Sequence, residues 1–213
     1  MLSSSKKLND FEIRKALSAY LIKKNFYTYE ILEELHVCNG RAIADLVTLK
    51  EGVHCYEIKG DGDRIERVID QNRYYQKSFR RLSLVTTDKH LEKALKVTPV
   101  HWGIMIAKFN RSNEVIIKYV RRPKINNNFD MKLALLTLRK SELLELLPFR
   151  NKKIEQSSRD VLASMICIDK KNYQISRVIG NTLIARKKLY SSSDHKLHVS
   201  IDSMFNHRSS TKS

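Results

Sequence analysis

Apolar side chains recur with two different periods along the first 120 residues, and this predicts an α/β chain. Ile13, Leu17 and Tyr20 follow a possible cap at Asn9 or Asp10 with helical spacing, so we expect a helix there. The segment from residue 29 to residue 35 is compatible with either a helix or a strand, and its periodicity does not decide between them.

Two β-rich runs, residues 43–49 and 53–59, flank a short turn that contains Gly52, and this predicts a β-hairpin. Because side chains alternate between the two faces of a strand, charged residues here fall among apolar ones on one face of each run. Burying a charge without a partner is costly, so this conflict marks a candidate functional position. The two mixed faces consist of Ile43, Asp45 and Val47 on the first run, and Val53, Cys55, Glu57 and Lys59 on the second.

Residues 64–79 have the pattern of an amphipathic helix. We expect Ile65, Val68, Ile69 and Phe79 to face the core, and Arg64, Arg67, Gln71 and Tyr75 to share another, polar stripe. On that stripe Gln71 should point to the same pocket as Glu57, with Tyr75 in support. A short strand at 82–86 and a helical stretch at 88–96 follow. A second hairpin is then predicted from residues 102–109 and 114–120.

The composition changes after residue 120. Residues 121–128 resemble a linker, a leucine-rich helix is predicted at 130–147 and ends near Pro148, and two more helical stretches follow at 157–168 and 172–188. The tail from Ser191 is rich in Ser, Lys and His, which is typical of a flexible segment. We therefore expect an α/β domain at 1–122, a basic helical extension at 123–190 and a flexible tail at 191–213.

Basic residues outnumber acidic ones, and the excess is uneven along the chain. Forty Lys and Arg stand against 23 Asp and Glu, a formal net charge of +17. Residues 1–120 carry +6 of this charge and residues 121–213 carry +11. Such a balance favours a polyanionic partner, most often nucleic acid, although a merely soluble basic surface has the same composition.

Other features exclude several classes of protein. The three cysteines, Cys38, Cys55 and Cys167, form no CxxC pair, so neither a disulfide framework nor a structural zinc site is indicated, and a cytoplasmic location is expected. No run approaches the length of a membrane span, so no membrane partner is expected. The sequence also lacks the phosphate-binding motif of P-loop ATPases.

The candidate chemistry lies on the predicted hairpin, where Asp45 precedes Glu57-Ile58-Lys59. Two carboxylates hold Mg²⁺ through hard oxygen ligands, and the metal can bridge a scissile phosphate and activate water. An ammonium at Lys59, two residues beyond Glu57, can neutralise charge that develops on the phosphate. This pattern suits hydrolysis of phosphodiester bonds.

Residues Ala44-Asp45, Glu57-Ile58-Lys59 and Gln71-x-x-x-Tyr75 resemble the core motifs of the PD-(D/E)XK superfamily of nucleases. The resemblance covers about residues 9–120, with Ala44 in place of the motif's proline, a position that varies widely in the superfamily. A longer string is similar to a bacterial, mobile-element-associated group of small proteins without an assigned function. Its matching residues are Arg41, Asp45, Glu57, Lys59, Asp63, Arg67, Gln71, Tyr75, His90-Leu91 and Trp102-Gly103-Ile104.

The resemblance implies a restriction-endonuclease-like core, in which a helix, a three-stranded meander, a helix and a strand build a mixed sheet, followed here by a C-terminal helical segment. It implies catalysis by Asp45, Glu57, Lys59 and Gln71. It also implies Mg²⁺, or Mn²⁺ as a substitute, on Glu34, Asp45 and Glu57, and DNA contacts from Arg41, Arg64, Arg67 and Tyr75.

Other interpretations of these residues stay open. Glu57 and Lys59 are also compatible with a surface strand pair, Glu34 with a solvated acid, and Gln71 with helix packing. The chain could bind nucleic acid without cutting it, as a subunit of a larger assembly, or act as a transcriptional regulator through its basic helices. Those leucine-rich helices also suit packing or a homodimer surface.

Overall fold

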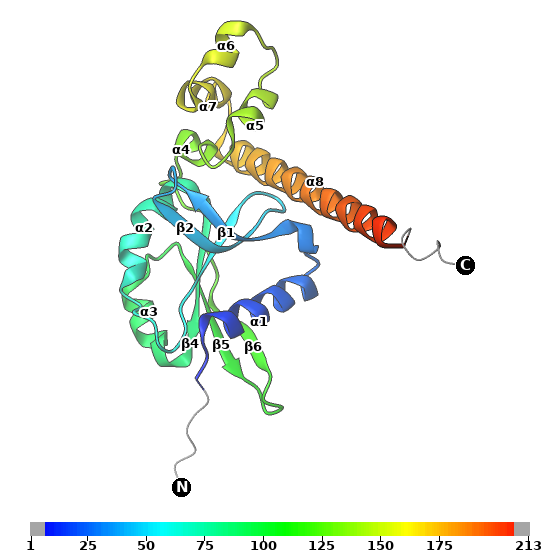
Figure 1. The fold of residues 1–213 in the computed structure, drawn as a ribbon. Coiled ribbons are helices and arrows are strands. Elements are labelled where there is room, and N and C mark those ends of the chain that lie inside the picture. Colours follow the sequence, from blue (N-terminus) through cyan, green and yellow to red (C-terminus); the bar gives the residue numbers. More distant parts are fainter. Residues whose placement is uncertain (1–6, 207–213) are drawn as a thin grey trace, which may run out of the picture.

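A six-stranded mixed sheet forms the centre of the structure, a computed structural model that describes residues 7–206 (Figure 1). The strands lie side by side in chain order, with antiparallel pairing through the first three, parallel pairing of the third, fourth and fifth, and an antiparallel sixth. The predicted α/β class with a mixed sheet is confirmed. The strands are β1 Ile31–Val37, β2 Ala42–Thr48, β3 His54–Ile58, β4 Arg81–Thr87, β5 Gly103–Phe109 and β6 Val115–Arg121.

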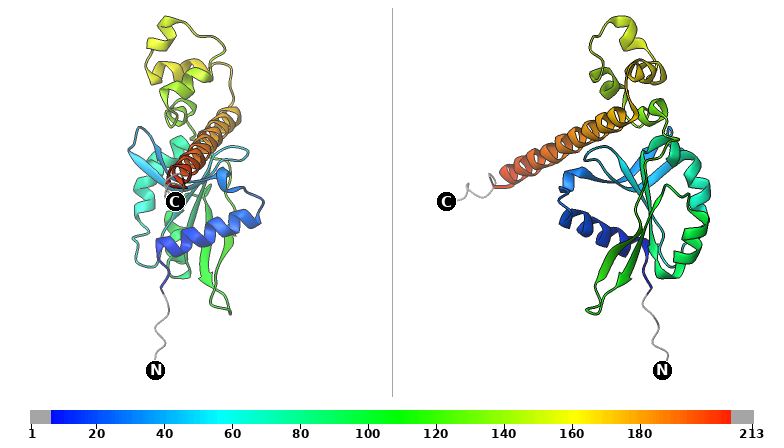
Figure 2. Two further views of the ribbon diagram at one scale, coloured as in Figure 1. Left: turned by 45° about the vertical axis from the view of Figure 1, so that its right-hand side comes forward. Right: turned by 180° about the vertical axis from the view of Figure 1, so that it is seen from behind.

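Helices cover both faces of this sheet (Figures 1 and 2). Helix α1 (Asp10–Lys23) begins at a capping box formed by Asn9 and Glu12, and packs on one face through Ile13 and Leu17. Helices α2 (Arg67–Ser78) and α3 (Leu91–Val97) join parallel strands and lie on the opposite face. Successive right-handed crossovers that advance in one direction place their helices on the same side of a sheet. The short 3₁₀ helices are η1 Thr28–Glu30 and η2 Asp88–His90.

The ambiguous segment at 29–35 is mostly strand β1, and its regular alternation is interrupted at Glu34. Glu34 has a φ of 55°, which is unusual for a residue with a Cβ. Ile31 packs with the α1 side, whereas Leu35, four residues further on, packs on the α2 side. The alternation of strand β2 changes at the same level: Ala44 packs in the same buried cluster as Val47. The exposed Ile43, which precedes Ala44, therefore lies on the other face, and the prediction that it shares a face with Val47 is wrong.

Helix α2 follows its predicted pattern with two exceptions. Ile65, Val68 and Phe79 are buried as expected, but Ile69 is 54% exposed. Tyr75, which shares the polar stripe and is predicted to contact DNA, is completely buried. Its ring lies against those of Phe79 and Trp102, because the sheet and the chain that follows cover this side of the helix.

Five helices follow the sheet and form an extension at one end of it (Figure 2). The single helix predicted at 130–147 is two short helices, because the backbone at Arg139 is extended, with a ψ of 159°, and a new helix begins after it. The last helix continues beyond residue 190, where we predicted a flexible tail; residues 207–213 lie outside the described residues. These helices are α4 Met131–Leu135, α5 Lys140–Glu145, α6 Lys152–Gln156, α7 Arg159–Cys167 and α8 Asn172–Asn206.

Helix α8 docks closely on the turn between β2 and β3. Ser176 Oγ accepts a hydrogen bond of 3.0 Å from the backbone N–H of Val53. Gly180 lies so near to Leu49 that a Cβ atom would overlap the Leu49 carbonyl oxygen. The extension and the sheet share one buried cluster, which includes Val47, Leu49, Leu138, Leu162, Ile175 and Leu183.

We expect the variant Gly180→Ala to destabilise the protein by roughly 1–3 kcal/mol, because its methyl group meets fixed backbone. Helix propensity alone predicts the opposite sign, a gain of about 1 kcal/mol. Urea unfolding measures the difference. Gly62→Ala is the matched control, since a Cβ there meets nothing within 4 Å, and it should change stability little. A stabilised Gly180→Ala variant would contradict the close docking of α8.

Candidate active site

Two charged side chains are buried where strand β3 ends. Glu57 is completely buried and Lys59 is 6% exposed. Lys59 Nζ donates a hydrogen bond to Glu57 Oε1 and a second, of 3.1 Å, to the carbonyl oxygen of Ile58. Removing charges from water is costly even when they pair, so a buried pair contributes little net stability and points to a role other than folding.

Asp45 lies beside this pair, on the neighbouring strand. Continuing the β2–β3 register by one residue places Asp45 opposite Glu57. Asp45 Oδ2 accepts a hydrogen bond of 2.7 Å from the backbone N–H of Ile58, and the side chain remains 23% exposed. Burial, and after it the charge of Glu57, raises the pKa of Asp45 from its ordinary value of 3.8 to about 7. The two carboxylates are therefore close enough to repel each other.

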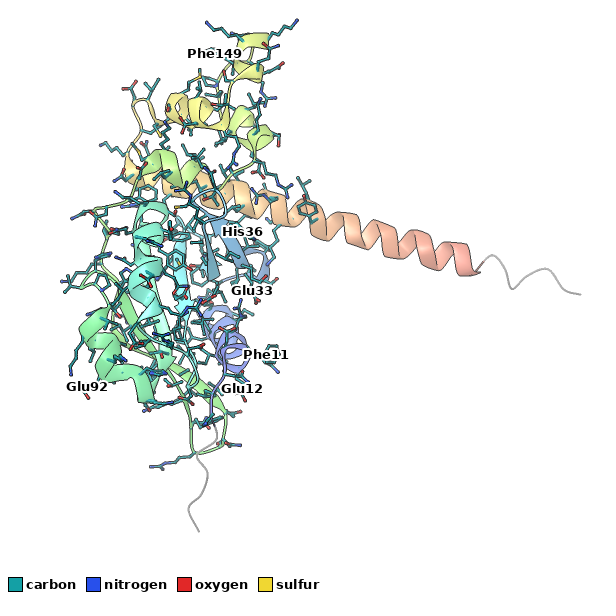
Figure 3. All side chains as sticks on the ribbon, turned by 60° about the vertical axis from the view of Figure 1, so that its left-hand side comes forward. Phe11, Glu12, Glu33, His36, Glu92 and Phe149 are labelled. Carbon is teal, nitrogen blue, oxygen red and sulfur yellow. The ribbon has the colours of Figure 1, made fainter. Side chains whose placement is uncertain are left out.

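Sequence reasoning missed Arg14 of helix α1, which brings a cation to the same place. Its Nη1 donates to the backbone oxygen of Asp45 at 2.7 Å, and its Nη2 lies 3.9 Å from Asp45 Oδ1. Arg14 also pairs with Asp10 at 3.0 Å and lies 3.6 Å from Glu33, which Figure 3 shows on β1 beside α1. The Asp10–Arg14 spacing of four residues was the available signal, but it is equally typical of a surface helix pair.

Helix α2 closes the site from the other side. The Tyr75 hydroxyl lies 2.9 Å from Glu57 Oε2 and 2.5 Å from the carbonyl oxygen of Ile43, and can donate to either. Gln71 Nε2 is 3.5 Å from the same hydroxyl, so Tyr75 connects Gln71 to Glu57. Burial, and after it Glu57, raises the pKa of Tyr75, which keeps its hydroxyl protonated. Because Tyr75 is buried, the direct DNA contact expected from it is replaced by a positioning role on Glu57.

The remaining predicted site residues lie further out. Arg41, in the β1–β2 turn, and Arg64 and Arg67, near the start of α2, are all exposed. Glu34 is exposed too, and the described residues contain no group of three or more Asp, Glu, His or Cys side chains that could hold a metal ion. The expected three-carboxylate site with Glu34 is therefore not formed, because the positive φ at Glu34 interrupts the alternation of β1.

The donor set at the site fits a hard divalent cation. Mg²⁺ is usually held by one or two carboxylates together with water and substrate phosphate oxygens, and Asp45 and Glu57 provide two carboxylates. The amide oxygen Oε1 of Gln71 is buried and has no hydrogen-bond partner, so an acceptor near the carboxylates stays unsatisfied. A third carboxylate is not needed for this kind of binding.

The raised pKa of Asp45 predicts a specific pH dependence for the metal-free protein. The folded chain holds this proton more tightly than the unfolded chain, so the contribution of Asp45 to stability falls as the pH rises from about 4 to about 7. Allowing for the exposed part of the side chain, the loss should be on the order of 3 kcal/mol.

The measurement is the free energy of unfolding in EDTA across this range, for the wild type and for Asp45→Asn. Asparagine cannot ionise, so the difference between the two curves isolates Asp45. It should grow with pH and level off above the pKa; a constant difference would contradict the assigned shift.

The fold and this site define a mixed α/β protein in which two carboxylates and a lysine gather at the end of a central strand, with Glu57 and Lys59 buried and Asp45 partly exposed. The chain belongs to the family of bacteriophage P4 protein cII, whose match covers residues 3–206. Protein cII of Enterobacteria phage P4 is 27% identical over 169 residues, which is 76% of this chain. The chain spans 63% of that relative's length.

Among solved structures, a protein of unknown function from Silicibacter pomeroyi is similar, with 16% identity and a TM-score of 0.42. The match covers 55% of this chain and 73% of that one. In the described residues, no helix is long and apolar enough to cross a membrane.

Proposed function

We propose that the chain is a metal-dependent nuclease of the PD-(D/E)XK type that hydrolyses phosphodiester bonds, with DNA as the expected substrate. The observation that carries the proposal is the gathering of Asp45, Glu57 and Lys59 at the end of β3, where the last two are buried. Two carboxylates and an ammonium on adjacent strands are the groups that this reaction uses.

The order of elements supports the proposal. Helix α1, the antiparallel meander β1–β2–β3, helix α2 and the parallel strand β4 follow the sequence of elements expected of a restriction-endonuclease-like core. In that arrangement the acid of β2 and the acid and lysine of β3 converge, as Asp45, Glu57 and Lys59 do here. Figure 1 shows α1 and α2 on opposite sides of these strands.

Each residue has a separate role in the proposed mechanism. Asp45 and Glu57 would hold Mg²⁺ or Mn²⁺, which would supply positive charge at the phosphate and a more acidic water. Tyr75 holds Glu57 in place through its hydroxyl, and Arg14 holds the backbone of Asp45. Lys59 keeps a positive charge beside Glu57, where it can stabilise negative charge that develops on the phosphate.

The charge of the chain suits the proposed partner. The net +17 favours contact with a phosphate backbone, and the exposed Arg41, Arg64 and Arg67 are positions from which such contacts can be made. Exposed arginines on nucleic acid mostly contact the phosphate backbone, and such contacts position the protein on the strand rather than read its sequence. We therefore expect binding with little sequence preference from these three residues.

The experiment is incubation of the full chain with circular and linear DNA, and with RNA, in the presence of Mg²⁺, Mn²⁺ or EDTA. We expect cleavage of DNA that depends on the metal and is lost in Asp45→Asn. A wild-type chain that binds DNA but cuts none of these substrates with either metal would support the alternative, a non-cutting nucleic-acid-binding subunit or regulator that keeps the nuclease fold.

A further inference from the structure

A second polar site lies at the opposite end of strand β3 from Lys59. A cavity of about 270 Å³ opens where the β2–β3 turn, the start of β4 and helix α8 meet. Four basic side chains line it, together with His54 and Ser176. The basic residues are Lys24, Lys50, Arg80 and Arg81.

Positive charge in this cavity is almost uncompensated. Glu51 is the one acidic residue among those that line it, and it is exposed. Among the side chains that the structure describes, residues 7–190, no ion pair involves any of these four basic groups. Neighbouring cations repel each other, and an anion between them would remove that repulsion.

Arg80 provides a second, independent indication that an anion binds in this cavity. Its Nε atom is buried and has no hydrogen-bond partner. A buried donor that stays unsatisfied costs about 1–3 kcal/mol, so such atoms call for a partner that the chain itself does not provide. Burial, and after it the charge of Arg81, lowers the pKa of Arg80, which is the direction expected for a guanidinium without a counter-ion.

Neutral groups complete the lining. Ser176 Oγ accepts a hydrogen bond from Val53, so its own hydroxyl hydrogen is available to donate. Burial, and after it Arg81, lowers the pKa of His54 to about 3, so this ring is neutral and its Nε2 pairs with Ser83 Oγ at 2.9 Å. Phe26 offers a half-buried aromatic wall, on which a sugar or a base can pack.

We propose that this cavity binds a phosphate group, either of a nucleic-acid backbone or of a free nucleotide. A guanidinium pair with flanking ammonium and hydroxyl groups matches the several acceptor oxygens and the charge of a phosphate. The site goes beyond the proposed nuclease function and does not depend on it.

The position of the cavity limits how a nucleic acid could use it. His54 and Lys59 are separated by five residues of extended chain, which is about 17 Å at 3.3 Å per residue. At the axial rise of a duplex, about 3.4 Å per base pair, this distance corresponds to about five base pairs. The cavity is thus separate from the candidate active site, and a duplex must extend over about this length to contact both.

The test compares Lys24→Gln/Arg81→Gln with Lys23→Gln/Arg111→Gln, two variants of equal charge. All four side chains are exposed, so folding should be preserved, but only the first pair lines the cavity. Affinity for a short DNA duplex is measured by fluorescence anisotropy in EDTA over a range of salt concentrations. Calorimetric titrations with inorganic phosphate and with AMP form the second arm.

If the bound phosphate belongs to a nucleic-acid backbone, DNA affinity should fall roughly tenfold more in the cavity variant than in the control. The salt dependence of DNA binding should also be shallower in the cavity variant. If the source is a free nucleotide, AMP or phosphate should bind the wild type and the control but not the cavity variant. Equal DNA, AMP and phosphate binding by both variants would overturn the inference. Because EDTA prevents metal-dependent cleavage, these binding measurements can be interpreted whether or not the chain is a nuclease. A negative binding result, in turn, leaves the nuclease proposal unaffected.

Discussion

The variant Asp45→Asn is expected to lower the rate of phosphodiester cleavage roughly a thousandfold, which corresponds to about 4 kcal/mol of transition-state stabilisation. An amide is a much weaker ligand for Mg²⁺ than a carboxylate, so metal affinity should fall together with the rate. The folded structure should survive, because the asparagine oxygen can still accept the hydrogen bond from Ile58. Stability and activity should therefore change in opposite directions near neutral pH.

Cleavage rates, Mg²⁺ titrations and DNA affinity in EDTA are the measurements. The matched control is Glu34→Gln, the same chemical change at the exposed acid that the resemblance assigned to the metal. It should cleave at close to the wild-type rate. If Glu34→Gln loses as much activity as Asp45→Asn, the two-carboxylate site is wrong and Glu34 belongs to the metal site after all.

The second large effect is a loss of stability when the buried ion pair of Glu57 and Lys59 is broken. The variant Lys59→Met should destabilise the protein by about 3–5 kcal/mol, because it leaves the carboxylate of Glu57 buried without its ion-pair partner. The double variant Glu57→Gln/Lys59→Met should recover much of this loss, since it removes the unpaired charge and keeps an acceptor for Tyr75. Urea unfolding at neutral pH gives all three free energies.

An ion pair on the surface provides the control for the buried Glu57–Lys59 pair. Lys93 and Glu66 also form an ion pair, but their side chains are 51% and 44% exposed, so Lys93→Met should cost less than about 1 kcal/mol. A similarly small effect of Lys59→Met would mean that water reaches Glu57 freely. In cleavage assays on the variants that stay folded, the loss of Lys59 should reduce the rate far more than the affinity for DNA, because its charge acts on the transition state.

Much of the sheet and its chemistry could be predicted from local pattern. The β-rich runs around Gly52 predict the β2–β3 hairpin, and the register of a hairpin brings Asp45 opposite Glu57 without further information. The second hairpin follows in the same way from its turn, where Asn110 Oδ1 accepts hydrogen bonds from the backbone N–H groups of Ser112 and Glu114. Short-range geometry is enough in both cases.

Errors arose where neighbours distant in the sequence decide the environment. Tyr75 shares a helical stripe with Arg67 and Gln71, yet it is buried, because Trp102 and the strand that carries Glu57 close over it. Ile69, which the apolar pattern assigns to the core, is 54% exposed. A helical period states which residues share a face, but not how wide the covered part of that face will be.

The sequence by itself determined the α/β class, the two hairpins and the pairing of an acid with the E-x-K motif, because each depends on periods and turns of a few residues. Only the tertiary structure decided that Arg14 meets Asp45, that Glu34 is left outside the cluster, and that Arg80 and Arg81 share a cavity with Lys24. These are contacts between elements, and their formation depends on the twist of the sheet and the docking of helices, which no local pattern encodes.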